Sequence, residues 1–184
     1  MRMNFSGFRA NRRGSFRGGF TMIELLTVIS IIVVLLSLSF FGGRIALIRA
    51  KENKARAQVK LLGLVLQDYE ADQGFFPPGN GDKQSSNQLY QALYATPLQD
   101  GTTVYADLDP NSSQQFSGQI VNRDILDPFR KNPYFYLRGE DESGEVVQDA
   151  FNVDFDLWSV GHNGVGRGVG GTSEDDIADD IGNW

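Results

Sequence analysis

The chain has 184 residues, of which 41% are hydrophobic and 22% charged, and this length and composition suit one folded domain with an anchor and exclude a disordered or collagen-like chain. Five of its 17 basic residues lie within the first 19, so the rest carries 12 basic side chains against 23 acidic ones. Such an acidic body excludes nucleic acid as the expected partner, and the absence of cysteine excludes disulfides, thiolate metal sites and thiol nucleophiles.

Residues 20–41 form an apolar stretch in which Glu24 is the one charged side chain. A helix over these 22 residues rises roughly 33 Å, and the hydrocarbon core of a bilayer is about 30 Å thick. A secretory signal places its small residues after a shorter apolar stretch, whereas Gly18 and Gly19 come before this one. The sequence therefore predicts a transmembrane helix over 20–41, with a carboxylate in the span that needs a compensating partner.

The same helix is predicted to continue as an amphipathic helix over residues 42–73, although Gly42 and Gly43 are expected to bend or locally unwind it. Spacings of four and three residues, typical of a helix face that packs on a core, relate Ala55, Val59, Leu62, Leu66 and Tyr69. The basic residues that lie largely off this face are Arg44, Arg49, Lys51, Lys54, Arg56 and Lys60. They are about as numerous as the basic residues of the leader, so charge alone does not predict which end of the span is cytoplasmic. We favour a solvated face for them, and contact with phospholipid headgroups stays open.

Residues 74–184 are predicted to form a head of mixed structure. After a loop over 79–86, residues 87–95 suit a short helix with Leu89 and Leu93 inward, ended by Thr96-Pro97. Residues 98–124 are polar and without a clear period, which favours a surface loop.

Two strands are predicted near the C-terminus of the head, one within 126–139 and one within 152–161. A polar connection joins them, so the simplest arrangement is an antiparallel pair. The expected fold class is therefore α+β: a long N-terminal helical spine, with its apolar half in the membrane, packed on a small antiparallel β-sheet head with a C-terminal loop.

The segment RGGFTMIELL, Arg17 to Leu26, resembles the prepilin-peptidase motif of type IV pilins and type II secretion pseudopilins. The resemblance implies that residues 1–19 are a cytoplasmic leader, cleaved between Gly19 and Phe20, and that Phe20 is then N-methylated. It also implies that Glu24 meets the amino terminus of a neighbouring subunit, which supplies the opposite charge that an apolar helix bundle otherwise lacks.

Three further segments, DPFRKNPYFYL, DLWSVGHNG and the terminal DDIGNW, are similar to the major, G-type pseudopilin of type II secretion systems. This resemblance implies a single-pass protein of the inner membrane whose head, residues 74–184, lies in the periplasm. It implies a structural subunit that polymerises into a pseudopilus and assists protein export across the outer membrane. The implied partners are other copies of the chain in a helical filament, the prepilin peptidase, the inner-membrane assembly platform, minor pseudopilins and membrane lipid.

Two other functions stay open. One is a type IV pilin that forms a surface fibre for adhesion or motility, although DDIGNW and the lack of a C-terminal cysteine pair lean against it. The other is a monomeric membrane-tethered binding module. An enzyme is not expected, because the one histidine lies in a glycine-rich loop and no catalytic spacing stands out.

The segment from Val160 to Trp184 combines glycines with clustered carboxylates, which suits a hard cation such as Ca²⁺. Zinc is not expected with one histidine and no cysteine. The G-type resemblance implies a calcium ion held by the carbonyls of Val160 and His162, the side chain of Asn163, and the carboxylates of Asp179 and Asp180. Asn163 stands where the family has aspartate, and a lengthened loop adds Asp175 and Asp176 as alternates. The other interpretation is a solvated acidic tail.

Overall fold

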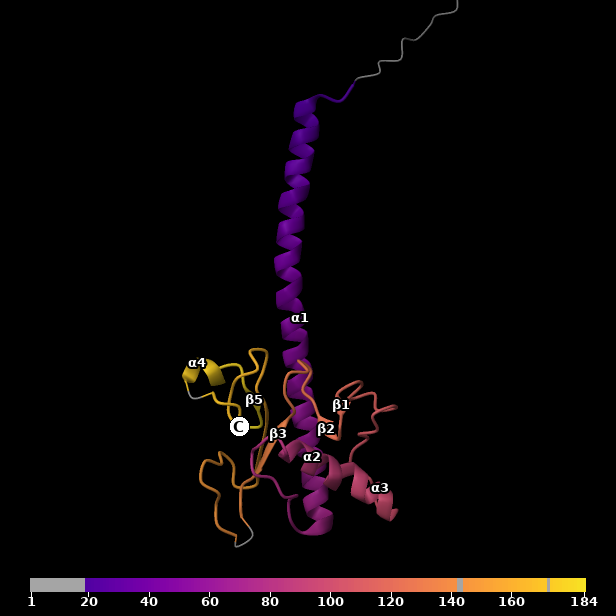
Figure 1. Ribbon diagram of the computed structural model, residues 1–184, viewed down its shortest axis with the longest axis vertical. Coiled ribbons are helices and arrows are strands. Elements are labelled where there is room, and N and C mark those ends of the chain that lie inside the picture. The colour runs from indigo at the N-terminus through magenta and orange to yellow at the C-terminus, as the bar shows by residue number, and fades with distance from the viewer. Residues whose placement is uncertain (1–18, 142–143, 172) are drawn as a thin grey trace, which may run out of the picture. The chain divides into compact units, whose positions relative to one another are not determined.

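The computed structural model describes residues 19–141, 144–171 and 173–184, with the backbone alone at 40–42. The chain divides into two compact units, Met1–Gly43 and Arg44–Trp184. Helix α1 (Met22–Gln73), drawn from indigo to magenta in Figure 1, contributes to both units. It continues through Gly42 and Gly43, so the local unwinding expected there is not observed. All but the last residue of the predicted leader lies outside the described residues.

In the described part of the first unit, α1 exposes apolar side chains from Met22 to Leu38, and this stretch is long and apolar enough to cross a membrane. Thr21 and Glu24 form a capping box at its start. The amide and hydroxyl of Thr21 donate to the Glu24 carboxylate at 2.8 and 2.9 Å, and the Glu24 amide donates to the Thr21 hydroxyl at 3.3 Å. The hydroxyls that bond to carbonyls of their own helix, as an apolar environment requires, belong to Thr27, Ser30, Ser37 and Ser39.

In the second unit, one face of α1 is buried in the core of the head. The predicted stripe is confirmed at Ala55, Val59, Leu62 and Leu66, which are buried, while Tyr69 is partly buried. Gln58 lies between them and is also buried. Its side chain exchanges hydrogen bonds with that of Gln119, at 3.0 and 3.1 Å, and accepts one from the Tyr134 hydroxyl at 2.9 Å. A buried polar group is stable only when it is bonded in this way.

Three short helices run without a break after the first loop: α2 (Ser85–Tyr90), the π-helix η1 (Gln91–Ala95) and α3 (Thr96–Asp100). Leu89 and Leu93 are fully buried, as predicted. The predicted helix end at Thr96-Pro97 is wrong, because Pro97 lies in the first turn of α3. The carbonyl of Leu93, to which Pro97 has no amide to donate, instead accepts from the amides of Tyr105 and Ala106 at 3.0 and 3.3 Å.

The segment 98–124, predicted as a surface loop, contributes to the core. Leu108 and Phe116 are buried, and β1 (Ile120–Val121) pairs antiparallel with β2 (Asp124–Ile125). The two residues between these strands, Asn122 and Arg123, both have positive φ, 53° and 71°, as a two-residue type I′ turn requires. Single apolar residues among polar neighbours gave no period from which to predict this burial.

The larger sheet has the order β3-β4-β5, with β3 (Phe135–Arg138), β4 (Phe155–Ser159) and β5 (Ile181–Gly182) all antiparallel. The predicted pair is confirmed by the β3–β4 register, and β5 was not predicted. Every residue of β4 is buried, so both faces of this strand are covered. Phe155 and Leu157 belong to the cluster that includes α1, and Trp158 belongs to a second cluster with Phe135.

Candidate functional site

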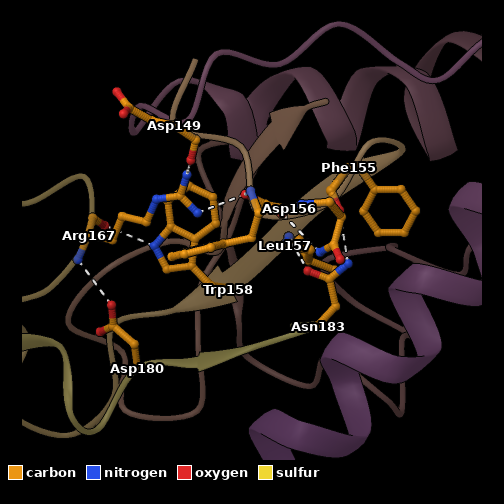
Figure 2. Close-up of polar contacts among 10 residues, drawn as sticks. Asp149, Phe155, Asp156, Leu157, Trp158, Arg167, Asp180 and Asn183 are labelled. Carbon is orange, nitrogen blue, oxygen red and sulfur yellow. Dashed lines mark hydrogen bonds and ion pairs between the residues drawn. The ribbon is translucent and has the colours of Figure 1, made fainter. Parts of the chain in front are cut away.

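The C-terminal segment, yellow in Figure 1, is hydrogen-bonded to β4 through the two residues of β5 and also beyond them. Asn183 accepts from the Leu157 amide at 2.8 Å and donates to the Phe155 carbonyl at 2.9 Å, so its side chain extends the ladder of strand hydrogen bonds (Figure 2). The last residues of the chain are thereby held along β4. This arrangement brings the predicted ligands that follow β4 next to those that precede β5.

Arg167, in the loop between β4 and α4, contacts the face of β4 that belongs to the second core cluster. Its guanidinium pairs with the buried carboxylate of Asp156 at 2.8 Å and also donates to the Asp149 carbonyl (Figure 2). It lies over the rings of Phe151, Trp158 and Trp184, at 4.5, 4.8 and 5.7 Å from their centroids. These six residues are named the Arg167 cluster.

The Asp156 carboxylate of the Arg167 cluster is buried and fully bonded, as a buried charge must be, whereas Arg167 is partly exposed. Besides Arg167, Asp156 accepts from the Phe151 amide at 2.8 Å and from the backbone and side-chain nitrogens of Asn152 at 3.0 and 2.9 Å. Trp158 donates from its indole nitrogen to the Arg167 carbonyl at 2.9 Å. No sequence pattern predicted this cluster, although one signal was present: Arg167 is the single lysine or arginine after Arg138.

Asp179 closes the loop that follows β4. One carboxylate oxygen accepts from the amides of His162 and Asn163 at 2.8 and 3.0 Å and lies 2.7 Å from the His162 ring nitrogen Nδ1. Gly161 passes so close that a Cβ there would lie 2.2 Å from the Asp179 carbonyl, and its φ of +67° also favours glycine. The other carboxylate oxygen of Asp179 is buried and has no hydrogen-bond partner among the described residues.

Asp180 resembles Asp179 in having one bonded and one unbonded oxygen. Its Oδ2 accepts from the Arg167 amide at 3.0 Å, while its Oδ1 is buried without a hydrogen-bond partner in the described part of the chain. Burial raises the pKa of Asp180 to about 6, and the negative charge of Asp179 adds to the effect. Two neighbouring carboxylates therefore each have one buried oxygen without a hydrogen-bond partner among the described residues, and Asp180 binds a proton more readily than an exposed aspartate does.

Two of the other predicted calcium ligands have other partners. The His162 carbonyl accepts from the Lys131 ammonium at 2.5 Å, and the Asn163 side-chain oxygen accepts from the Val165 amide at 2.7 Å. Val160 itself is buried in the second core cluster. Within the described ranges, no group of three or more histidine or acidic side chains is placed to hold a metal. Asp179 and Asp180 each keep a carboxylate oxygen without a hydrogen-bond partner among the described residues, whereas the His162 carbonyl and the Asn163 side-chain oxygen are already bonded.

The alternate pair, Asp175 and Asp176, serves a different purpose. Both lie in the one-turn helix α4 (Glu174–Ile177), where Asp176 and Ser173 form a capping box with bonds of 3.2 and 3.3 Å. The Asn163 side chain donates to the Asp176 carbonyl at 3.0 Å. These contacts stabilise the start of α4 and assign Asp176 a local structural role.

The predicted processing site lies at the N-terminal edge of the described residues. Gly19, Phe20 and Thr21 precede α1 and are not helical, and the Phe20 side chain is 81% exposed. Glu24 lies in the first turn of α1, bonded to Thr21 as described above. The Gly19–Phe20 bond therefore lies outside regular secondary structure.

The comparisons with known proteins identify no relative: the chain matches no family model, no curated protein sequence and no solved structure. Its function has to be argued from its own residues.

Proposed function

We propose that this protein is a membrane-anchored structural subunit of the type IV pilin-like class, cleaved between Gly19 and Phe20 and assembled through α1 into a type II secretion pseudopilus. In this proposal the anchor lies in the inner membrane and the second unit lies in the periplasm. Its partners are other copies of the chain, the prepilin peptidase, the inner-membrane assembly platform, minor pseudopilins and membrane lipid.

The observation that carries the proposal is the N-terminal segment RGGFTMIELL together with the helix that follows it. A non-helical Gly19–Phe20 bond precedes α1, and Glu24 is the one acidic residue in an exposed apolar stretch. A carboxylate in the centre of a bilayer costs about 2.5–3.5 kcal/mol and less near its edge. Cleavage after Gly19 creates a positively charged amino group at Phe20, and a neighbouring copy would bring such a group to Glu24.

The C-terminal segment supports the pseudopilin assignment and a calcium ion within it. The residues that resemble the G-type subunit, DLWSVG and DDIGNW, supply β4, β5 and the Arg167 cluster's Asp156, Trp158 and Trp184. We propose that Ca²⁺ binds at the unbonded oxygens of Asp179 and Asp180 and neutralises them, which would fix the loop after β4 against β5.

Mass spectrometry of the protein extracted from membranes tests processing directly. The expected species begins at Phe20 and carries one added methyl group. Gly19→Leu should block the cut, because the peptidase then meets a branched side chain at the bond, whereas the matched variant Gly18→Ala should be processed. A membrane-extracted wild-type chain that keeps Met1 to Gly19 would exclude both pilin-like functions.

A deletion strain separates the secretion pseudopilus from the surface fibre. Loss of secreted proteins from the medium with intact surface fibres supports the proposal. Loss of fibres with normal secretion would instead assign the chain to the surface pilins. Cross-linking in membranes adds a third arm, because a chain that never links to its own copies is the monomeric binding module.

A further inference from the structure

A cavity of about 410 Å³ in the second unit is lined by basic side chains. It lies between α1, the segment before β1 and the turn before β3. The lining contains no carboxylate, and three of its six residues are cations; the six are Lys51, Lys54, Ser117, Gln119, Pro128 and Arg130. We call this cavity the basic pocket.

Two of the three cations are held in place by neutral neighbours. The Arg130 guanidinium packs against Gly118, where a Cβ would lie 2.6 Å from Nη2, so a side chain at position 118 would displace it. Both residues have positive φ, +65° at Gly118 and +58° at Arg130, so this approach uses two left-handed backbone positions. The Lys51 ammonium lies 5.9 Å from the centroid of the Phe129 ring. Both contacts are with neutral groups, so neither offsets the positive charge of its cation.

The cations of the basic pocket form no ion pair with the described residues. The two ion pairs found there are His162–Asp179 and Arg167–Asp156, both in the C-terminal segment. By contrast, Lys131 donates to the carbonyls of His162 and Asn163, and Arg138 donates to that of Glu140.

The floor of the basic pocket is neutral. Gln119 is buried, and its amide is engaged with Gln58 and with the Leu126 carbonyl, at 2.6 Å for the latter. The Ser117 hydroxyl is exposed beside it and adds a neutral donor. The pocket therefore presents three positive charges and a hydroxyl, with its one amide turned inward.

We propose that the basic pocket binds a phosphate group. An arginine fork and two ammonium groups suit a multiply charged tetrahedral oxyanion, because phosphate accepts several charge-assisted hydrogen bonds at once. A carboxylate carries a single charge and would leave two cations unneutralised. The phosphate comes either from the headgroup of an anionic lipid or from solution. Lys51 and Lys54 follow the apolar stretch 20–41 closely in sequence, as in polybasic segments that attract anionic headgroups. This binding is independent of filament assembly.

Calorimetric titration of the full-length chain in zwitterionic detergent with inorganic phosphate tests the pocket, at constant ionic strength set with chloride. Wild type should bind phosphate, and the double variant Lys54→Gln with Arg130→Asn should weaken binding by about tenfold or more. The matched control is Lys83→Gln with Arg123→Asn. It removes two exposed cations outside the pocket, one of them also at positive φ, and should change the affinity less than about twofold.

Asparagine replaces Arg130 in the test variant and Arg123 in the control because it tolerates positive φ. Circular dichroism of each variant checks that the fold is kept. If the double variant fails to fold, Arg130→Lys replaces it: this change keeps the charge but loses the fork, and it should weaken phosphate binding by a smaller factor. Absence of phosphate binding by wild type, or equal loss in the pocket and control variants, overturns the proposal.

Reconstitution distinguishes the two sources of phosphate. In bilayers of phosphatidylcholine alone, added phosphate should bind as in detergent. If phosphatidylglycerol in the bilayer weakens the binding of added phosphate, headgroups occupy the pocket; if it does not, the ligand is soluble phosphate, and either result supports the site. If wild type binds no phosphate but the double variant loses cross-linking between copies, the occupant is a carboxylate of a second copy and the proposal fails.

Discussion

Gln58 is a polar residue within the buried stripe of α1, and its amide is the partner of two other buried groups, the Gln119 amide and the Tyr134 hydroxyl. Burial raises the pKa of Tyr134, so its hydroxyl keeps the proton that it donates. The network ties α1 to the segment before β1 and to the residue before β3. A pattern of apolar residues cannot reveal it, because the pattern treats Gln58 as an interruption.

Gln58→Leu should lower the free energy of unfolding by about 2–4 kcal/mol, because it leaves the side-chain oxygen of Gln119 and the hydroxyl of Tyr134, both buried, without the bonds that Gln58 made. Urea unfolding of a fragment that begins at Arg44, with the full chain in detergent as a check, measures the change. Tyr134→Phe is the control: it removes one hydroxyl, keeps the Gln58–Gln119 pair and should cost about 1 kcal/mol. Equal stability of Gln58→Leu and wild type would show that the network contributes nothing.

Asp127 gives the head a pH dependence. It is buried, Ser159 donates to its Oδ2 at 2.8 Å, and burial raises the pKa of its carboxyl. The folded protein therefore holds this proton at pH values where the unfolded chain, with a pKa of about 3.9, has lost it. The stability contributed by the protonated carboxyl is full below the unfolded pKa and is lost as the pH rises through the folded pKa.

Asp127→Asn should remove that loss. As the pH rises from the unfolded to the folded pKa of Asp127, the unfolding free energy of wild type should fall by up to about 1.4 kcal/mol per pH unit relative to that of Asp127→Asn. Urea unfolding of both proteins across this window measures it, and the other titrating groups cancel in the difference. Parallel stability curves would show that the pKa of Asp127 is not raised.

At the scale of elements, the sequence was informative where structure is local. The apolar stretch 20–41 and the periodic face from Ala55 to Tyr69 predicted the helix from Met22 to Gln73, and two apolar segments near each other in the chain predicted the β3–β4 pair. The strand β5 and the continuation of the helix past Thr96-Pro97 had no such signal. Each depends on contacts outside its own segment: β5 on β4, and the turn at Pro97 on the amides of Tyr105 and Ala106, which bond to the Leu93 carbonyl.

At the candidate metal site, too, the sequence revealed local features and not the tertiary contacts. The sequence identified Asp179 and Asp180 as acidic residues beside a glycine-rich loop, and the structure brings both to that loop with an unbonded oxygen each. It could not reveal that Lys131, from the turn before β3, reaches the His162 carbonyl. Nor could it show that Asp176 caps α4. Such competition between partners is decided by tertiary contacts and not by residue type.

Calcium should raise the melting temperature of the head if it binds at Asp179 and Asp180. A ligand at 100 times its dissociation constant adds about 2.7 kcal/mol to the free energy of unfolding, and Asp179→Ala with Asp180→Ala should abolish the calcium-dependent part. Thermal melts with calcium and with chelator measure it. Asp175→Ala is the control and should keep the response; a response lost in Asp175→Ala would move the site to the alternate pair, and identical melts in wild type would remove it.

At the scale of the whole molecule, the two units differ in the chemistry of their surfaces. The described part of the first is an exposed apolar helix with one acidic side chain, and the second is a head with its own core. This helix is long and apolar enough to cross a membrane, and in the proposed membrane-bound filament the charge of Glu24 needs a partner. Assembly is therefore expected to depend on Glu24 and not on the hydroxyls, which are bonded within the helix.

Glu24→Gln should keep the protein in the membrane but reduce its assembly by about tenfold or more, because the amide keeps the bond to Thr21 and loses the charge that meets a neighbouring amino group. Cross-linking in membranes and recovery of filaments measure assembly. Thr27→Val is the matched control, since it removes a hydroxyl of the same helix that needs no outside partner. Normal filaments from Glu24→Gln would contradict the role given to this carboxylate.

Both tryptophans of the chain belong to the Arg167 cluster: Trp158 is buried on β4, Trp184 is the half-exposed last residue, and their ring centroids lie 6.0 Å apart. The tryptophan fluorescence of the protein therefore originates at one place, the junction of the C-terminal segment with the sheet. Release of that segment would expose one indole and separate it from the other while the opposite core around α1 stays intact. The protein thus carries an unlabelled optical reporter that separates detachment of its C-terminus from unfolding of its helix.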